Sequence, residues 1–518
     1  MPVRLGGLGM PQHHHRLERT APGRLVQRRA ASQSTSKPLR RTTLGAWELA
    51  CRFSAANAMV FAVLSWVSFL MAASSLPVIL SAPCLFFVGS VVSFVLFVRS
   101  GGAFAAVGWF VLGAGVYFGL GVFVSGLDPE SVLLSDLLRV NILNSSSVAL
   151  VLATAVPFAY RPRTARMAVV GQRNGKALLL RLFPPIVVLA VGSLGLQWIF
   201  FPIAENLIVR SFLSYFQLIT PFCLLTLGMV WRSLRPRWVA LGVAVFLLAF
   251  TLSLLSMAKL SVMSNVVALV AGTWVYRRSL QSVVGGLIVL VVVYAYIGPL
   301  ANQGRLHIDY DAVANSPTTR LGILHDTIVG DSSGNQAWAS GPSVANEAVS
   351  IDFRRFSVVD IQAYLMEQYD NGQPGTSLDD FWVAAVPRIF WPDKPIVTRF
   401  GAELYEQFEN IADGTSNLAP TYTGEAYWNF GPLGVVVVSI LVGLEIGWLT
   451  RRWYMATRGL DPAFFVIAFP TALWASFVES WIAAQYVGGF LTIVLLWRLS
   501  RFLLLDGFLG ASSGAGRK

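Results

Sequence analysis

Long apolar runs alternate with short charged connections along most of this 518-residue chain. A helix needs about 20 mainly apolar residues to cross a bilayer. Twelve runs meet or approach that length, so the pattern predicts an all-α polytopic membrane protein of about twelve transmembrane helices. The expected spans lie near residues 54–73, 76–98, 103–125, 142–160, 182–203, 207–231, 238–257, 261–276, 280–299, 431–450, 462–480 and 485–504.

The spans divide the chain into five expected parts. Residues 1–52 form a basic tail, residues 53–299 hold helices one to nine, and residues 431–505 hold helices ten to twelve. Residues 300–430 form a long polar loop between helices nine and ten, and residues 506–518 form a second tail. With 55% hydrophobic and 13% charged residues, the composition excludes a soluble globular protein of this length.

Charge indicates which side each connection faces. The short basic connections all fall on one side if the N-terminus is cytoplasmic, as the positive-inside rule requires. The stretch from Ala301 to Phe430 holds 17 of the 27 acidic residues but only 7 of the 39 Lys and Arg, a local net charge of −10. We therefore expect this loop to be exported and both termini to be cytoplasmic.

The basic excess lies beside apolar segments, which argues against nucleic-acid binding. The first tail, rich in Arg, Ser and Pro, is typical of a disordered cytoplasmic segment, and the run His13 to His15 within it is not expected to bind metal. No cleavable signal peptide is expected, because the first apolar run is long and lacks a small-residue cleavage site. The three cysteines lie in or beside apolar segments, so no disulfide framework is expected in the exported loop.

The exported loop is rich in aromatic residues, so it is expected to fold or to lie on the bilayer. Ser377 to Phe390 has the pattern of a short amphipathic helix, with Ser377 as its N-cap and Asp379 and Asp380 in the first turn. Phe381 and Trp382 share its apolar face. Pro387 is expected to kink or end this helix.

The most distinctive string of the loop is PRIFWPDKP, from Pro387 to Pro395. Three prolines stiffen the backbone around Arg388, Asp393 and Lys394, and Trp391 is suited to the headgroup layer. A lipid-linked phosphate lies at that depth, where a guanidinium matches phosphate oxygens and an ammonium acts as a point charge. The alternative is a juxtamembrane turn whose charges reach into water.

A second string, APTYTGEAYWNFGPLG from Ala419 to Gly434, leads into the tenth span. Glu425, Tyr427 and Trp428 supply the carboxylate and aromatic rings that grip sugars. The carboxylate is a candidate general base or sugar ligand. The alternative is a helix-entry motif in which Glu425 caps backbone amides.

The order RRFSVVD (Arg354 to Asp360), PRIFWPDKP and TGEAYWNFGPLG, within one large outer loop, resembles the Wzy-type oligosaccharide repeat-unit polymerases, the O-antigen polymerase family. The match covers about eighty residues, Arg354 to Gly434. The resemblance implies a glycosyltransferase of the bacterial cytoplasmic (inner) membrane, which moves a glycan between undecaprenyl-diphosphate carriers at the outer leaflet. It implies no cofactor, a lipid-linked oligosaccharide substrate, and a chain-length regulator and a flippase as candidate partners.

That reaction needs cations for the leaving diphosphate and a base for the acceptor hydroxyl. The candidate cations of the loop are Arg388, Lys394, Arg354, Arg355 and Arg399. The candidate bases, which sequence does not rank, are Glu425, Asp360, Asp393 and His325. Arg210 and Lys259 add candidate substrate contacts at the outer ends of helices, where snorkelling is the competing interpretation.

Some relatives carry an Arg followed eleven positions later by Gly, and no loop Arg here has that partner. Which arginine holds which diphosphate therefore stays open. The pair Asp309 and Asp311 has the spacing of a metal-binding motif, but no metal site is expected there or at His307 and His325. Two other functions remain: a ligase of the O-antigen ligase type, and a transporter or flippase of lipid-linked sugars, which needs charges along a central path.

Overall fold

The computed structural model describes residues 40–71, 75–126, 133–160, 171–199, 218–256, 259–306, 320–322, 325, 356–386, 390–391, 393–395, 399–409, 418–457, 461 and 463–502. The protein is an all-α polytopic membrane protein, as the apolar runs predict, and no strand occurs in these ranges. Its contacts divide it into two units, Met1–Leu44 and Gly45–Lys518, and the second unit contains the helical bundle.

The apolar runs form helices α2 (Arg40–Leu70), α3 (Leu76–Ser100), α4 (Ala106–Ala114), α5 (Val122–Gly126), α6 (Leu134–Tyr160), α7 (Gly171–Ile199), α9 (Ile219–Val230), α10 (Pro236–Leu255), α11 (Lys259–Tyr276), α12 (Leu280–Leu306), α17 (Tyr422–Thr457), α18 (Phe464–Ser476) and α19 (Phe490–Arg501). Two π-helices, η1 (Gly115–Gly121) and η5 (Ala483–Gly489), join α4 to α5 and lead into α19. A 3-10 turn, η3 (Trp231–Ser233), follows α9.

Ten segments in the described part of the chain are long and apolar enough to cross a membrane. They correspond to ten of the twelve expected spans. The runs near 207–231 and 462–480 contain the shorter helices α9, of 12 residues, and α18, of 13 residues. The count of twelve spans stays a prediction at those two places.

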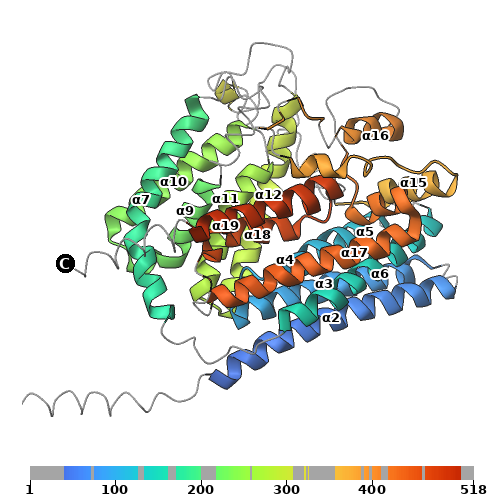
Figure 1. Ribbon diagram of the computed structural model, residues 1–518, viewed down its shortest axis with the longest axis horizontal. Coiled ribbons are helices and arrows are strands. Elements are labelled where there is room, and N and C mark those ends of the chain that lie inside the picture. The colour runs from blue at the N-terminus through green and yellow to red at the C-terminus, as the bar shows by residue number, and fades with distance from the viewer. Residues whose placement is uncertain are drawn as a thin grey trace, which may run out of the picture. The chain divides into compact units, whose positions relative to one another are not determined.

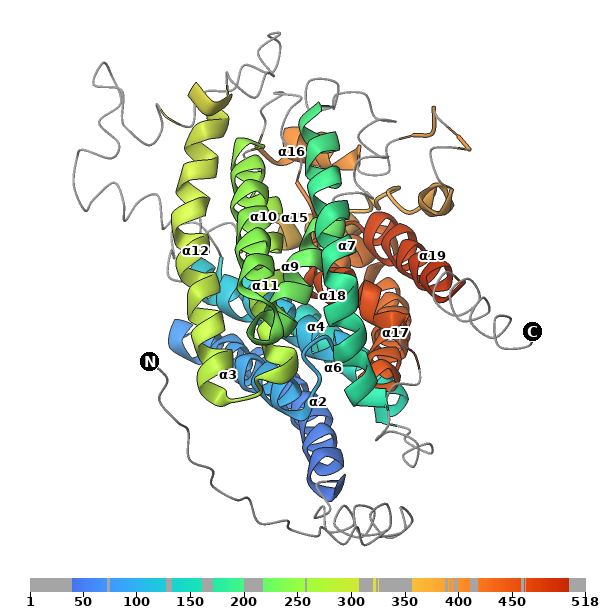
Figure 2. The same cartoon turned by 90° about the vertical axis from the view of Figure 1, so that its left-hand side faces the viewer.

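The helices pack in two groups that touch each other. In one, α9 and α11 pack together with α7, α10 and α12 around them; in the other, α17 packs along α6, beside α3, α4 and α18 (Figure 1). Contacts between α12 and α3, and between α18 and α9, join the groups. The same groups can be followed in the perpendicular view (Figure 2).

Helices α6 and α17 approach each other closely because small residues line their contact. A β-carbon added to Gly443 would lie 1.8 Å from the Thr154 hydroxyl, and one added to Gly447 would lie 2.7 Å from the Ala155 carbonyl oxygen. Small residues spaced in this way let two helix backbones meet without a side chain between them. The close packing of α6 on α17 therefore holds the residues at the start of α17 in a fixed position.

Helix α17 begins earlier than the expected tenth span and bends where that span was expected to start. Gly431 has φ 63° and ψ −154°, outside the helical region, and Pro432 follows it. The residue before a proline avoids helical angles, and a positive φ favours glycine. The nine residues Tyr422 to Phe430 thus form a separate helical segment, which holds the polar residues of the second string other than Thr421.

The described part of the loop between α12 and α17 holds α15 (Val359–Asp370), η4 (Phe381–Ala385) and α16 (Phe400–Glu409). Helix α15 packs on both α6 and α17. Over the described residues 377–386, the expected amphipathic helix is a turn followed by the five-residue 3-10 helix η4, so the prediction of an α-helix there was wrong. Ser377 does not cap it, because the hydroxyl of this residue is engaged by Glu425.

Candidate functional site

Glu425 lies at the first turn of α17 and is completely buried, with a side-chain exposure of 0%. Its Oε1 accepts a hydrogen bond from the Ser377 hydroxyl at 2.8 Å, and its Oε2 accepts one from the backbone N–H of Ile482. Asn429 donates to Ser377 at 2.9 Å and to the main-chain oxygen of Glu425 at 2.9 Å. The carboxylate thus ties the loop, α17 and the chain before η5 together.

The backbone around Glu425 is tied in the same way. Tyr422 donates its N–H to the Val478 carbonyl at 3.2 Å, and Thr421 forms a β-bridge with Glu479. Leu378 donates its N–H to the Asn429 side chain at 3.2 Å. Backbone capping was the alternative interpretation of Glu425, and these contacts favour it over the role of an accessible base.

A second buried network joins α6, α15 and α17. Gln362 and Asn144 exchange two hydrogen bonds between their amides, each of 2.9 Å, across 218 positions of sequence. The Gln362 amide also donates to Thr421 and to Thr423, and the Thr423 hydroxyl donates to Asn144 at 2.9 Å. Because every member is buried and hydrogen bonded, this network fixes where α15 sits on the membrane bundle.

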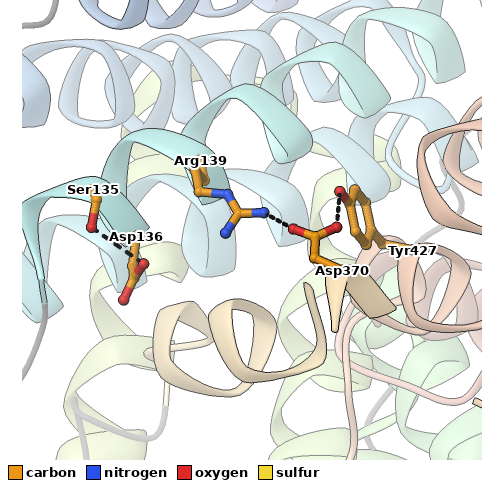
Figure 3. Close-up of polar contacts among 5 residues, drawn as sticks. All are labelled: Ser135, Asp136, Arg139, Asp370 and Tyr427. Carbon is orange, nitrogen blue, oxygen red and sulfur yellow. Dashed lines mark hydrogen bonds and ion pairs between the residues drawn. The ribbon is translucent and has the colours of Figure 1, made fainter. Parts of the chain in front are cut away.

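The same three helices meet a second time at an exposed cluster (Figure 3). Arg139, from the second turn of α6, forms an ion pair with Oδ2 of Asp370, the last residue of α15. The Tyr427 hydroxyl of α17 donates to Oδ1 of Asp370 at 3.1 Å. The side chains of Arg139 and Asp370 are 38% and 41% exposed, so this cluster faces solvent.

Aromatic rings surround that cluster. The rings of Tyr369 and Tyr427 meet edge to face, with centroids 5.5 Å apart. Gly431 lies directly against the Tyr369 ring, where an added β-carbon would come within 2.6 Å. Trp428 packs its ring on Gly375 and accepts that residue's N–H at its carbonyl oxygen, at 2.9 Å. The aromatic residues of the second string thus hold α15 and the following turn in place.

The segment carrying Trp391 and Lys394 folds back on η4. The Lys394 ammonium donates to the carbonyl oxygens of Val386, at 2.7 Å, and Val383, at 3.2 Å, at the carboxyl end of η4. Trp391 stacks on Trp382 at 5.8 Å between centroids. Phe390 is 81% exposed, which leaves this edge of the loop apolar.

The remaining described candidates fall at separate places. Arg399 lies over the ring of Phe400, 4.9 Å from its centroid. Lys259, 8% exposed, lies 5.9 Å from the ring centroid of Tyr294, which in turn packs against Phe356. The other three candidate bases are exposed: Asp360, Asp393 and His325.

The candidates Arg210, Arg354, Arg355 and Arg388 lie outside the described residues, as do His13 to His15, His307, Asp309 and Asp311. Glu425, Tyr427 and Trp428 are brought together on one helical turn, with Asp360 on the adjacent α15. Lys394 and Trp391 both contact the η4 turn, which packs on η5. Lys259 belongs to a different place, between α11 and α12.

Sequence analysis missed Arg139, Asp370 and Glu445. Arg139 carries a readable signal, because it is a cation close to the end of an apolar span. Glu445 lies within α17, and its Oε2 is buried without a hydrogen-bond partner. Asp370 has no sequence signal, since its partners are far away along the chain.

In the part of the chain that the structure describes, no group of three His, Cys, Asp or Glu residues has the geometry of a metal site. No family model matches this chain, and no curated protein or solved structure matches it either. The fold and its spans therefore define the class directly, a multi-pass α-helical membrane protein.

Proposed function

We propose that the protein is a membrane glycosyltransferase that polymerises lipid-linked oligosaccharide repeat units at the outer leaflet of a bacterial cytoplasmic membrane. In this reaction the bond between the donor sugar and its diphosphate breaks, a glycosidic bond to an acceptor hydroxyl forms, and the hydroxyl proton passes to a base. The chemistry requires a cation, a carboxylate and a sugar-binding surface in one place, beside the bilayer.

The observation that carries the proposal is the way α15 and the start of α17 are built onto α6. The buried amide pair of Gln362 and Asn144 holds a loop helix against a membrane helix. Beside it, the same helices present Arg139, Asp370 and Tyr427 to solvent. A loop that only connected two spans would need neither arrangement, since connecting segments are usually held by few buried polar contacts.

The proposed export of the loop is tested first. A short epitope tag inserted next to Gly334 is expected to be reachable by antibody from outside intact cells. Labelling only after the cells are opened would reverse the orientation and remove the proposed access to outer-leaflet substrates.

The activity is tested by deleting the gene in the native host and sizing the surface glycan. We expect long chains to disappear while single repeat units persist on their acceptor. Loss of all transfer to the acceptor instead identifies a ligase. An unchanged glycan overturns the proposal.

The phosphate-binding role proposed for Arg388 is tested by Arg388→Ala at matched expression. The expected result is loss of long glycan, because a guanidinium contact to the leaving diphosphate is removed. Glu403→Ala, an exposed position on α16, serves as the control for general effects of loop substitutions. Undiminished polymer in Arg388→Ala assigns the diphosphate to other cations.

Transport of lipid-linked sugars is the second candidate, and Glu445 is the observation that favours it. A carboxyl group in a membrane span with one buried, unpartnered oxygen is a functional candidate, because such a group is costly there. If transport is the function, deletion strains accumulate lipid-linked repeat units facing the cytoplasm. Glu445→Gln then reproduces that accumulation, whereas a polymerase leaves the repeats facing outward.

A further inference from the structure

We propose that Asp370 binds a sugar hydroxyl of the glycan substrate, at the exposed cluster that it forms with Arg139 and Tyr427 (Figure 3). This inference rests on the proposed function and names a residue that the sequence motifs do not contain. It assigns the carboxylate of the site to α15 in place of the buried Glu425.

The first support is the orientation of the carboxylate. Figure 3 shows Asp370 between Arg139 and Tyr427, each of which holds one carboxylate oxygen. A carboxylate has about four lone-pair positions, so two such contacts leave acceptor capacity on both oxygens. With 41% of its side chain exposed, Asp370 presents that capacity to solvent. Sugar hydroxyls are donors that match it.

The second support is the aromatic surface beside it. Tyr369 precedes Asp370 in the sequence, and Tyr427 contacts it from α17; the two tyrosine rings meet edge to face. Buried contacts fix both rings, since Tyr369 lies on Gly431 and Tyr427 lies within one turn of Trp428 and its contact with Gly375. Rigid aromatic rings next to an oriented carboxylate form the kind of surface that binds the apolar faces and the hydroxyls of a sugar together.

The third support is that fastening alone does not explain the cluster. Ion pairs that water reaches contribute little to stability, and α15 is already fixed by Gln362, Asn144 and Thr423. Arg139 orients the carboxylate for a ligand, so it acts as a positioning residue.

The test separates ligand binding from attachment of α15 by exchanging the two charges. The exchange keeps an ion pair between α6 and α15 but removes the carboxylate from position 370. In the double variant Arg139→Asp with Asp370→Arg, the opposite charges still face each other across α6 and α15. Asp370→Asn keeps the size of the side chain and removes the charge. Asp136→Asn is the matched control, because Asp136 lies one turn earlier on α6 and contacts Ser135 instead.

The full-length protein in lipid nanodiscs is titrated with fluorescently labelled repeat units released by mild acid from the host's own surface glycan. We expect Asp370→Asn and the double variant each to weaken binding about tenfold, since a hydrogen bond to a charged group is lost. Asp136→Asn is expected to bind like the wild type. All variants should show the same thermal unfolding midpoint within about 2 °C.

Three results overturn the inference. Binding by the double variant within about twofold of the wild type shows that the pair only fastens α15. If inorganic pyrophosphate competes with the labelled glycan, and this competition depends on Arg139, the cluster binds an anion and not a sugar hydroxyl. If the wild-type protein binds none of the released repeat units, the glycan is not a ligand of this cluster.

Failure of this inference and failure of the proposed function give different results in cells. An unchanged glycan in the deletion strain disproves the polymerase whatever the variants do. Loss of long glycan in the deletion strain, combined with normal glycan in Asp370→Asn, keeps the polymerase and disproves the role of Asp370.

Discussion

Helices α6, α15 and α17 meet in two polar clusters that use similar chemistry in opposite ways. In the buried cluster, Gln362, Asn144 and Thr423 bond only with protein groups, and none of them has exposed surface. In the exposed cluster, Arg139 and Asp370 keep more than a third of their side chains in solvent. The donors and acceptors of the buried cluster all bind protein groups and so position α15. The exposed cluster keeps acceptor capacity that a ligand could use.

The comparison changes the reading of Glu425. By residue type it is the best base of the motif, yet its two oxygens are occupied by Ser377 and the N–H of Ile482, and it has no exposed surface. By placement it belongs with the buried cluster. Asp370, outside every motif, has the exposure and orientation that a substrate contact needs. Burial and partners thus separate two carboxylates that sequence treats alike.

The sharpest way to break this comparison is Glu425→Ala. It leaves a donor on Ser377 and the Ile482 N–H buried without an acceptor, so we expect the free energy of unfolding to fall by about 3 kcal/mol. Unfolding of the protein in detergent micelles, followed by circular dichroism, measures the loss. Glu425→Gln retains the shape and one acceptor and is expected to lose about 1 kcal/mol. Unaltered stability with abolished glycan polymerisation in Glu425→Ala would return Glu425 to the role of base.

The next largest effect is expected for Gln362→Leu, which removes a double amide pair. Asn144 loses both bonds of its amide pair and the two threonine hydroxyls lose a donor, so unfolding in micelles should become easier by about 2 kcal/mol. Proteolysis of the native protein is expected to cut near α15 first, because this helix loses its attachment to α6. Gln368→Leu, on the same helix and partly exposed, is the control. Equal stability of the two variants would show that the buried network does not hold α15.

The apolar runs predict the spans well, because hydrophobic length is a local property of the chain. They do not predict that Gln362 pairs with Asn144, since an amide gives no periodic signal and its partner lies 218 positions away. The string FGPLG contains the bend at Gly431, but its meaning depends on Tyr369 packing against it. The motifs single out the helical turn that carries Glu425 and Tyr427, but residue type alone does not distinguish a buried carboxylate such as Glu425 from an exposed one such as Asp370.

Lys394 is a third test of whether a charged group of the loop acts on structure or on substrate. Its ammonium closes the carbonyl end of η4 through Val386 and Val383, so part of its capacity is already used for position. Lys394→Met keeps the apolar stem and is expected to cost about 1 kcal/mol of stability and to loosen η4. Hydrogen exchange of residues 381–386 measures the loosening. If exchange is unchanged while long glycan is lost, Lys394 acts on the substrate and belongs with the exposed cluster.

The smallest expected effect is the coupling between Arg139 and Asp370 in unfolding. An ion pair this exposed is expected to contribute about 0.5 kcal/mol in a double-mutant cycle of Arg139→Ala and Asp370→Ala, falling further in high salt. The same cycle for Gln362→Ala and Asn144→Ala is expected to give at least about 1 kcal/mol, with little dependence on salt. Two similar couplings would erase the distinction between the clusters. A large, salt-insensitive coupling for Arg139 and Asp370 would make their pair a fastening of α15, whose exposure is then incidental.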